Sequence, residues 1–272
     1  KLSLKGRILA SLFYEPSTRP RRSFESAMIK LGGQILTTEN AAEFSSAVKG
    51  ESMEDTIRVV SCYSDGIVLR HNVEGMAEKA AGISPIPIIN AGDGKGQHPT
   101  QALVDVYTIY KELGRLDNLS VAMAGDLAYG RTIRSLSYLL GKFSGNHLIF
   151  VSQPHLCVGD DIKNYLLRHN TKFTEQSELE EVLPQADIIY MTRIQKERMT
   201  HDEYETAKGR LSITESNLPQ VRPTARILHP LPHQEEINFP IEVEQKDPRI
   251  AYFRQVENGL YIRMALLLHL LK

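Results

Sequence analysis

The chain has 272 residues, of which 42 % are hydrophobic and 24 % are charged, and its formal net charge is −1. This composition is typical of a globular protein, and without a basic block it excludes nucleic-acid binding through an extended basic surface. No apolar run is long enough to span a bilayer, so we expect no membrane partner. Two distant cysteines without a Cys-x-x-Cys motif predict a cytoplasmic protein. The first residues contain neither an initiator methionine nor a signal peptide, and we therefore expect a fragment of a longer chain.

Apolar, β-rich segments alternate with segments of helical periodicity along the whole chain. A first strand is expected at residues 7–14, followed by a helix with apolar residues at helical spacing up to Leu31. The further predicted strands are residues 66–70, 86–90, 120–124, 147–151, 187–191 and 225–229. The further predicted helices are residues 52–63, 74–81, 99–113, 131–142, 160–169 and 261–271. This alternation predicts an α/β fold of parallel sheets with helices on both faces and ligand sites at the carboxyl ends of strands.

Residues 13–24 join the first strand to its helix, and in them two adjacent hydroxyl residues, Ser17 and Thr18, are followed by three arginines. Ser17 and Thr18 fall near the expected start of the helix, and Arg19 follows directly. Unpaired backbone N–H groups, the positive end of a helix and guanidinium groups together predict a phosphate or carboxylate site. The alternative is a capped helix with solvated arginines. We also expect Pro20 to push Arg19 away from helical backbone angles.

Residues 17–21 resemble the Ser-Thr-Arg-Thr-Arg carbamoyl phosphate signature of the aspartate and ornithine transcarbamoylases, with Pro20 in place of the threonine. The segment 229–233 reads His-Pro-Leu-Pro-His and resembles the His-Pro-Leu-Pro-Arg of the aspartate branch, whereas the ornithine branch usually has His-Cys-Leu-Pro. Pro230 therefore favours the aspartate branch. Further resemblances to the same family follow the same chain order, at residues 45–52, 68–71, 92–101, 125–132 and 191–198.

The resemblance implies two Rossmann-like domains, each a parallel β-sheet with helices on both faces. A carbamoyl phosphate-binding domain would comprise residues 1–99 and 258–272, without the family's N-terminal helix, and an aspartate-binding domain residues 100–257. The implied reaction is carbamoyl transfer from carbamoyl phosphate to the amino group of L-aspartate, giving N-carbamoyl-L-aspartate and phosphate, in de novo pyrimidine biosynthesis. No metal or cofactor is implied. A homotrimer with shared active sites is implied, and regulatory chains are left open.

The family's functional residues map onto matching positions of this sequence. The implied carbamoyl phosphate ligands are Ser17, Thr18, Arg19, Ser45, Lys49, Arg70, His98 and Gln101, of which Arg19, Lys49, Arg70 and His98 are implied catalytic residues. The implied aspartate ligands are Lys49, Arg131, Thr132, Arg193, Gln195 and Leu231. Glu197 would orient an arginine, and Ser45 and Lys49 would reach a neighbouring subunit. The departures from the family pattern are Pro20, Ala128 in place of lysine and His233 in place of arginine.

Several alternatives stay open. Residues 125–132 nearly match a P-loop, which would indicate a nucleotide-dependent enzyme, although Arg131 replaces the lysine that contacts phosphates. His229 and His233 lie four residues apart like metal ligands, but the intervening prolines exclude a helix. Pro20 and His233 leave room for a catalytically impaired homologue with a binding or assembly role, and another amino acid acceptor is a further alternative. Two distant cysteines, Cys62 and Cys157, are expected to be free core thiols.

Overall fold

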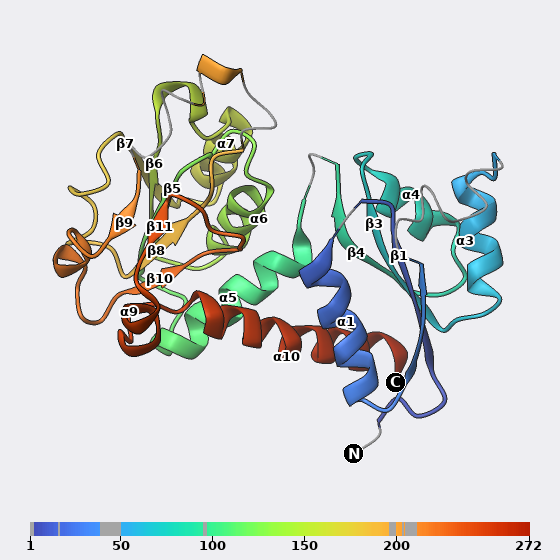
Figure 1. Ribbon diagram of the computed structural model, residues 1–272. Coiled ribbons are helices and arrows are strands. Elements are labelled where there is room, and N and C mark those ends of the chain that lie inside the picture. The colour runs from blue at the N-terminus through green and yellow to red at the C-terminus, as the bar shows by residue number, and fades with distance from the viewer. Residues whose placement is uncertain are drawn as a thin grey trace. The chain divides into compact units, whose positions relative to one another are not determined.

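The computed structural model describes residues 3–15, 17–38, 50–94, 97–195, 200–202, 204 and 211–272. The chain divides into two compact units, unit 1 being Lys1–Thr100 with Glu257–Lys272 and unit 2 being Gln101–Val256. Each unit is built on a parallel β-sheet flanked by helices, which confirms the predicted α/β fold (Figure 1). Within the described ranges, no helix is both long and apolar enough to cross a membrane.

The sheet of unit 1 has four parallel strands in the order β2-β1-β3-β4. Alternate side chains of β1 point to opposite faces, so Leu9 packs with α1 and α10 whereas Ala10 packs with α3 and α4. Its elements are β1 (Ile8–Phe13), α1 (Thr18–Lys30), β2 (Gln34–Thr38), α3 (Met53–Ser61), β3 (Gly66–His71), α4 (Met76–Ile83), β4 (Ile88–Asp93), the start of α5 (Pro99–Leu113) and the end of α10 (Tyr252–Leu271).

The sheet of unit 2 has five parallel strands in the order β10-β8-β5-β6-β7. One face packs against helices α5, α6 and α7, and the other is covered by the segments 179–186, 211–225 and 231–252, which include the short sheet of β9 and β11. Its remaining elements are β5 (Ser120–Ala124), α6 (Arg131–Leu140), β6 (His147–Val151), α7 (Asp160–Arg168), β7 (Lys172–Gln176), β8 (Ile188–Met191), β9 (Ile213–Thr214), β10 (Arg226–Leu228), β11 (Ile237–Asn238) and α9 (Ile241–Lys246), with short 3-10 turns at Pro154–Leu156 and Leu218–Gln220.

Each sheet has one switch point, where the chain reverses the direction in which it adds strands. In unit 1 the chain goes from β1 outward to β2 and then returns to β3 on the other side of β1. In unit 2 it adds β6 and β7 on one side of β5 and then β8 and β10 on the other. Loops diverge at such points and open a crevice at the carboxyl ends of the strands. Ligand sites are therefore expected beside β1 and β3 and beside β5 and β8.

Two predictions about local backbone were wrong. Arg19 lies inside α1 together with Pro20, because a proline in the first turn removes an N–H that has no partner within the helix. Helix α10 begins at Tyr252, well before the predicted residue 261. Asn258 and Gly259 are weak helix formers and hide this start in the sequence, but tertiary burial of Tyr252 and Gln255 favours the helix.

The prediction for the cysteines was partly wrong. Cys62 and Cys157 are both free thiols, as expected. Cys62, however, is exposed at the carboxyl end of α3, and Cys157 is only half-buried after the turn at Pro154–Leu156. Cysteine is common in protein cores, but burial is decided by the face of the element on which the residue falls.

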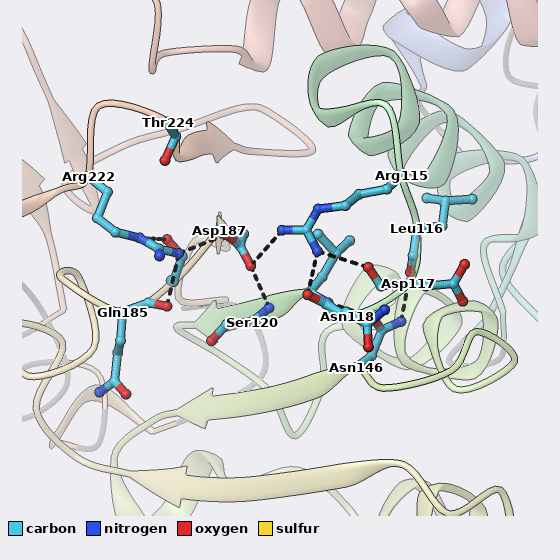
Figure 2. Close-up of polar contacts among 12 residues, drawn as sticks. Arg115, Leu116, Asp117, Asn118, Ser120, Asn146, Gln185, Asp187, Arg222 and Thr224 are labelled. Atoms are coloured by element: carbon cyan, nitrogen blue, oxygen red, sulfur yellow. Dashed lines mark hydrogen bonds and ion pairs between the residues drawn. The ribbon is translucent and has the colours of Figure 1, made fainter.

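A polar cluster closes the amino edge of the sheet in unit 2. Asp187 lies just before β8, and its carboxylate accepts the backbone N–H of Ser120 at 2.9 Å and a guanidinium N–H of Arg222 at 2.8 Å (Figure 2). Arg115 approaches the same carboxylate from the opposite side, with its Nη2 3.5 Å from Oδ2 (Figure 2). This cluster lies at the sheet edge opposite to the switch-point loops, so its role is structural.

A second ion cluster in unit 2 should make stability depend on pH. Glu112 receives hydrogen bonds from Arg226 at 2.8 Å and from Arg254 at 2.7 and 2.9 Å. Burial alone would raise the pKa of the Glu112 carboxyl, but the two arginines outweigh burial and lower that pKa. A lowered folded-state pKa means that this stabilisation is complete above the unfolded pKa of about 4.3 and is lost as the pH falls through the folded value.

We expect Glu112→Gln to lower the free energy of unfolding at pH 7 by about 1 to 3 kcal/mol, because two charged donors lose a charged acceptor. The variant should also lose less stability than the parent between pH 5 and 3. Urea unfolding across this pH range measures both effects. The exposed Glu178 offers the control, since Glu178→Gln should change neither the stability nor its slope with pH. Equal acid sensitivity of the parent and Glu112→Gln would contradict this account.

Candidate active site

The predicted anion site of unit 1 begins at the amino end of α1. Ser17 is the N-cap residue, with an extended backbone, and its hydroxyl makes no capping hydrogen bond. Thr18 and Arg19 are exposed, and the first turn contains no acidic residue. Helix α3 shows the usual alternative, in which the Ser52 hydroxyl accepts the backbone N–H of Asp55 at 3.1 Å. The positive end of α1 lacks this internal compensation and is suited to an external anion.

Arg70 lies at the carboxyl end of β3, next to β1 at the switch point. Its backbone carbonyl accepts the N–H of Tyr14 at 2.9 Å, and its Nε lies 3.2 Å from Glu15 Oε2. The side chain of Arg70 is 13 % exposed. Burial lowers the pKa of the guanidinium, and the Glu15 carboxylate opposes that shift. Glu15 therefore holds Arg70 at the same edge of the sheet as the start of α1.

The loop after β4 is shaped by Asp93. This buried carboxylate accepts the backbone N–H of Gly75 at 2.9 Å and the side-chain amide of Asn90 at 3.1 Å. Gly94 follows with φ +48°, and a Cβ there would lie 2.5 Å from the backbone nitrogen of Glu74. Only glycine fits this turn without moving the backbone. The loop after β4 is thereby joined to the one after β3.

Helix α5 starts directly after His98, one of the predicted carbamoyl ligands. His98 is buried, and α5 begins at Pro99. Gln101 lies in the first turn of α5 and donates from Nε2 to Asp105 Oδ1 at 2.7 Å, one helical turn further on. This bond directs the nitrogen of the Gln101 amide toward Asp105 and leaves its carbonyl oxygen on the other side.

In unit 2 the loops after β5 and β8 are tied together. Gly125 has φ +119°, and a Cβ there would lie 2.2 Å from the carbonyl oxygen of Thr192, so the two backbones approach too closely for any other residue. Asp126 is buried, and its carboxylate accepts the N–H of Tyr129 at 2.9 Å and the amide of Gln195 at 3.0 Å. Asp126 thus holds a predicted aspartate ligand at the switch point.

The predicted aspartate ligands beside this contact are half-buried and lie at the ends of elements. Arg131 is the first residue of α6, whose first turn contains no acidic residue and whose N-cap, Gly130, has no side chain to cap it. Thr132 follows it in the helix. Arg193 lies just after the end of β8. Two cationic side chains therefore follow the carboxyl ends of neighbouring strands, an arrangement suited to a carboxylate ligand.

The segment 229–233 after β10 has a distorted backbone fixed by His229. The ring of His229 is buried, with Nδ1 accepting the N–H of Leu231 at 2.8 Å and Nε2 lying 3.0 Å from Glu236 Oε1. Leu231 has φ +57° and is followed by a cis peptide bond to Pro232. Left-handed backbone at a residue other than glycine costs about 1 to 3 kcal/mol and is typical of functional sites. Because both ring nitrogens of His229 have protein partners, the metal alternative is disfavoured.

The structure brings some predicted residues together and leaves others undescribed. Arg70 and the start of α1 share one switch point, and Gln195 and Arg131 share the other. Ser45, Lys49 and Glu197 lie outside the described residues. Sequence reasoning missed the acidic residues that fix the loops and side chains of the described site, which are Glu15, Asp93, Asp105, Asp126 and Glu236. For Asp105 a signal existed, since glutamine and aspartate four residues apart on a helix form a hydrogen-bonded pair.

Two parallel α/β units with cationic residues at their switch points define a class of α/β enzymes that act on anionic small molecules. Family models described as "Aspartate/ornithine carbamoyltransferase, carbamoyl-P binding domain" and "Aspartate/ornithine carbamoyltransferase, Asp/Orn binding domain" match residues 1–111 and 117–270. The chain belongs to the aspartate/ornithine carbamoyltransferase family.

Individual relatives point to the aspartate branch. The chain is 56 % identical over 266 residues to the chloroplastic aspartate carbamoyltransferase of Arabidopsis thaliana, covering 97 % of this chain and 67 % of the relative. The catalytic subunit of M. jannaschii aspartate transcarbamoylase has a TM-score of 0.91 and 47 % identity, covering 98 % of this chain and 86 % of that one. Aspartate transcarbamoylase from Trypanosoma cruzi in complex with carbamoyl phosphate and aspartate has a TM-score of 0.90 and 36 % identity, covering 99 % and 84 %.

Proposed function

We propose that this chain is an aspartate carbamoyltransferase, which transfers the carbamoyl group of carbamoyl phosphate to the amino group of L-aspartate in pyrimidine biosynthesis. The observation that carries the proposal is the match of both family domains in order along the chain. It is supported by 56 % identity to an aspartate carbamoyltransferase over 97 % of this chain. The Trypanosoma cruzi relative binds both proposed substrates.

Carbamoyl phosphate is assigned to the residues of the β1, β3 and β4 loops. Arg19, Arg70 and the backbone N–H groups of Ser17 and Thr18 hold the phosphate, an assignment supported by the uncompensated amino end of α1 and by the buried Arg70. His98 polarises the carbonyl oxygen. Gln101, Ser45 and Lys49 complete this set by resemblance.

Aspartate is assigned to unit 2. Arg131 and Arg193 bind the carboxylates, and Gln195 is held beside them by Asp126. The remaining ligands are Thr132, the backbone carbonyl of Leu231 and Lys49. The left-handed backbone of Leu231 supports a role for its carbonyl, because it directs that group away from an ordinary extended path.

The proposed reaction needs positioning and polarisation but no covalent intermediate. The aspartate amine attacks the carbonyl carbon, a C–N bond forms, and the bond between that carbon and the phosphate oxygen breaks. The departing phosphate takes the proton from the amine. Fixed donors near the carbonyl oxygen and the phosphate stabilise the charge that develops there.

The proposal is tested by incubating the purified chain with carbamoyl phosphate and L-aspartate and measuring carbamoyl aspartate and phosphate in equal amounts. L-Ornithine replaces aspartate in a parallel assay. Product from aspartate alone supports the proposal, whereas product from ornithine alone would assign another acceptor. Absence of product from either would favour the impaired homologue that Pro20 and His233 allow.

The near match of residues 125–132 to a P-loop does not indicate a nucleotide-dependent enzyme, because these residues fall within the matched Asp/Orn binding domain. This segment contains Arg131 and no lysine. A planar guanidinium favours a carboxylate ligand over a nucleotide phosphate. Thermal unfolding separates the two. A bisubstrate phosphonate should raise the melting temperature, and Mg²⁺-ATP should leave it unchanged.

We also propose a homotrimer in which Lys49 serves the site of a neighbouring subunit, as the family resemblance implies. Mixing Lys49→Ala chains with Arg19→Ala chains should then restore some intact sites, because each variant supplies what the other lacks. Activity of the mixture should clearly exceed the sum of the two parent variants. If native mass spectrometry confirms mixed trimers but activity does not recover, site sharing is refuted.

A cytoplasmic location stays a prediction, since the Arabidopsis thaliana relative is chloroplastic.

A further inference from the structure

Asp105 is a fully buried carboxylate on α5, and described side chains from α5, β8 and α10 donate hydrogen bonds to it. Its Oδ1 accepts the amides of Gln101 at 2.7 Å and Gln255 at 2.6 Å. Its Oδ2 accepts the hydroxyl of Tyr190 at 2.8 Å. Asp105 and Tyr190 are each 0 % exposed and Gln255 is 1 % exposed. Such burial of a carboxylate is costly unless its oxygens are satisfied, and here both oxygens accept hydrogen bonds.

Each partner leads to a different segment of the proposed site within unit 2. Gln101 is itself a proposed carbamoyl ligand. Tyr190 also contacts the hydroxyl of Thr132, a proposed aspartate ligand. The third partner, Gln255, accepts the N–H of His229 at 2.9 Å through its Oε1, and His229 in turn holds Leu231. One carboxylate therefore joins the start of α5, the start of α6 and the segment after β10.

The position of Asp105 requires a side chain that only accepts hydrogen bonds. A carboxylate has no proton to donate, so it fixes the nitrogen of each glutamine toward itself. For Gln255 this turns Oε1 toward the N–H of His229, in agreement with the observed bond. For Gln101 it turns the amide oxygen away from Asp105. Burial, with the nearby Asp105 charge, raises the pKa of Tyr190 and keeps its hydroxyl protonated as a donor.

We propose that Asp105 is a positioning residue that orients the Gln101 amide and, through Tyr190, the segments that hold aspartate. This inference rests on the proposed carbamoyl transfer. Asp105 need not touch either substrate. Its effect on the reaction is geometric, because misplacement of a substrate-positioning group by about 1 Å can cost about 10²-fold in rate.

The test is Asp105→Asn, which keeps the shape but introduces an NH2 group among three donors. We expect kcat/KM for aspartate to fall by about 10- to 100-fold in the folded protein. Asp187→Asn is the matched control, since Asp187 is a carboxylate with hydrogen-bond partners in the same unit at the opposite edge of the same sheet (Figure 2). It should lower the melting temperature without changing kcat or KM of the folded protein.

Two further variants separate positioning from a general loss of stability. Tyr190→Phe removes one donor without removing the ring, and it should lower kcat/KM for aspartate even if Asp105→Asn does not fold. In a Gln101→Ala background, adding Asp105→Asn should cost clearly less than it does in the parent, because part of its effect passes through Gln101. Fully additive losses would contradict the proposed route through Gln101.

The outcomes distinguish this inference from the proposed function. If the parent chain forms no carbamoyl aspartate, both the proposed function and the positioning role are contradicted. An active parent whose kinetics survive Asp105→Asn and Tyr190→Phe within about twofold overturns the positioning role alone, since the expected loss is larger. Equal kinetic losses in Asp187→Asn and Asp105→Asn would likewise overturn it.

Discussion

Pro20→Thr should raise kcat for carbamoyl aspartate formation by about 10²- to 10³-fold, the usual value of one donor to a developing oxyanion. Pro20 lies in the first turn of α1, where the family resemblance implies a threonine whose hydroxyl contacts the carbonyl oxygen. Threonine there also restores a backbone N–H at the positive end of the helix. The substitution should leave the fold intact, because first-turn positions accept either residue.

The measurement is kcat under saturating carbamoyl phosphate and aspartate for the parent, Pro20→Thr and Pro20→Ala. The alanine variant restores the N–H but supplies no hydroxyl, so it should stay close to the parent. An equal gain in both variants would assign the effect to the backbone and not to the hydroxyl. No gain in Pro20→Thr would show that this chain has another donor at the carbonyl oxygen.

Arg70→Ala should lower kcat/KM for carbamoyl phosphate by about 10²- to 10³-fold, in the range measured for truncating one member of a buried, hydrogen-bonded charge pair. The substitution removes a guanidinium that is 13 % exposed and leaves the Glu15 carboxylate without its cation at the same sheet edge. That carboxylate would then repel the phosphate. Arg70→Lys keeps the charge but not the planar fork, so it should fall between the parent and Arg70→Ala.

The chain offers a matched control at the other ends of the same two strands. Arg7 precedes β1 and pairs with Asp65, which precedes β3, with 2.6 Å between Nη1 and Oδ1. Arg7→Ala removes an arginine–carboxylate pair from the amino edge of the sheet and should leave kcat/KM unchanged. Steady-state kinetics of Arg70→Ala, Arg70→Lys and Arg7→Ala decide the matter. Retention of activity in Arg70→Ala, or an equal loss in Arg7→Ala, would contradict the assignment of Arg70.

Much of the fold could be predicted from the sequence because local patterns carry it. Strands β5 and β6 and helix α5 coincide with the predicted residues 120–124, 147–151 and 99–113. Continuous apolar runs are typical of strands buried on both faces, and three- to four-residue spacing is typical of helices. The same patterns failed for β7, whose residues are exposed or half-buried, and for the start of α10, where Gly259 interrupts the helical signal.

For the candidate site, the contiguous motifs were enough to predict the family, the proposed substrates and the ligand-bearing segments, because their chemistry depends on residue type. The side chains that hold those ligands in place could be identified only in the folded chain, because they come from distant parts of the sequence. Glu15 pairs with Arg70. Asp105 accepts hydrogen bonds from Tyr190 and Gln255, which lie 85 and 150 residues further along the chain. Burial decided their importance as well. An exposed and a buried carboxylate cannot be told apart in the sequence. Only the buried one needs a hydrogen-bond donor for each of its oxygens, and the fold supplies these donors.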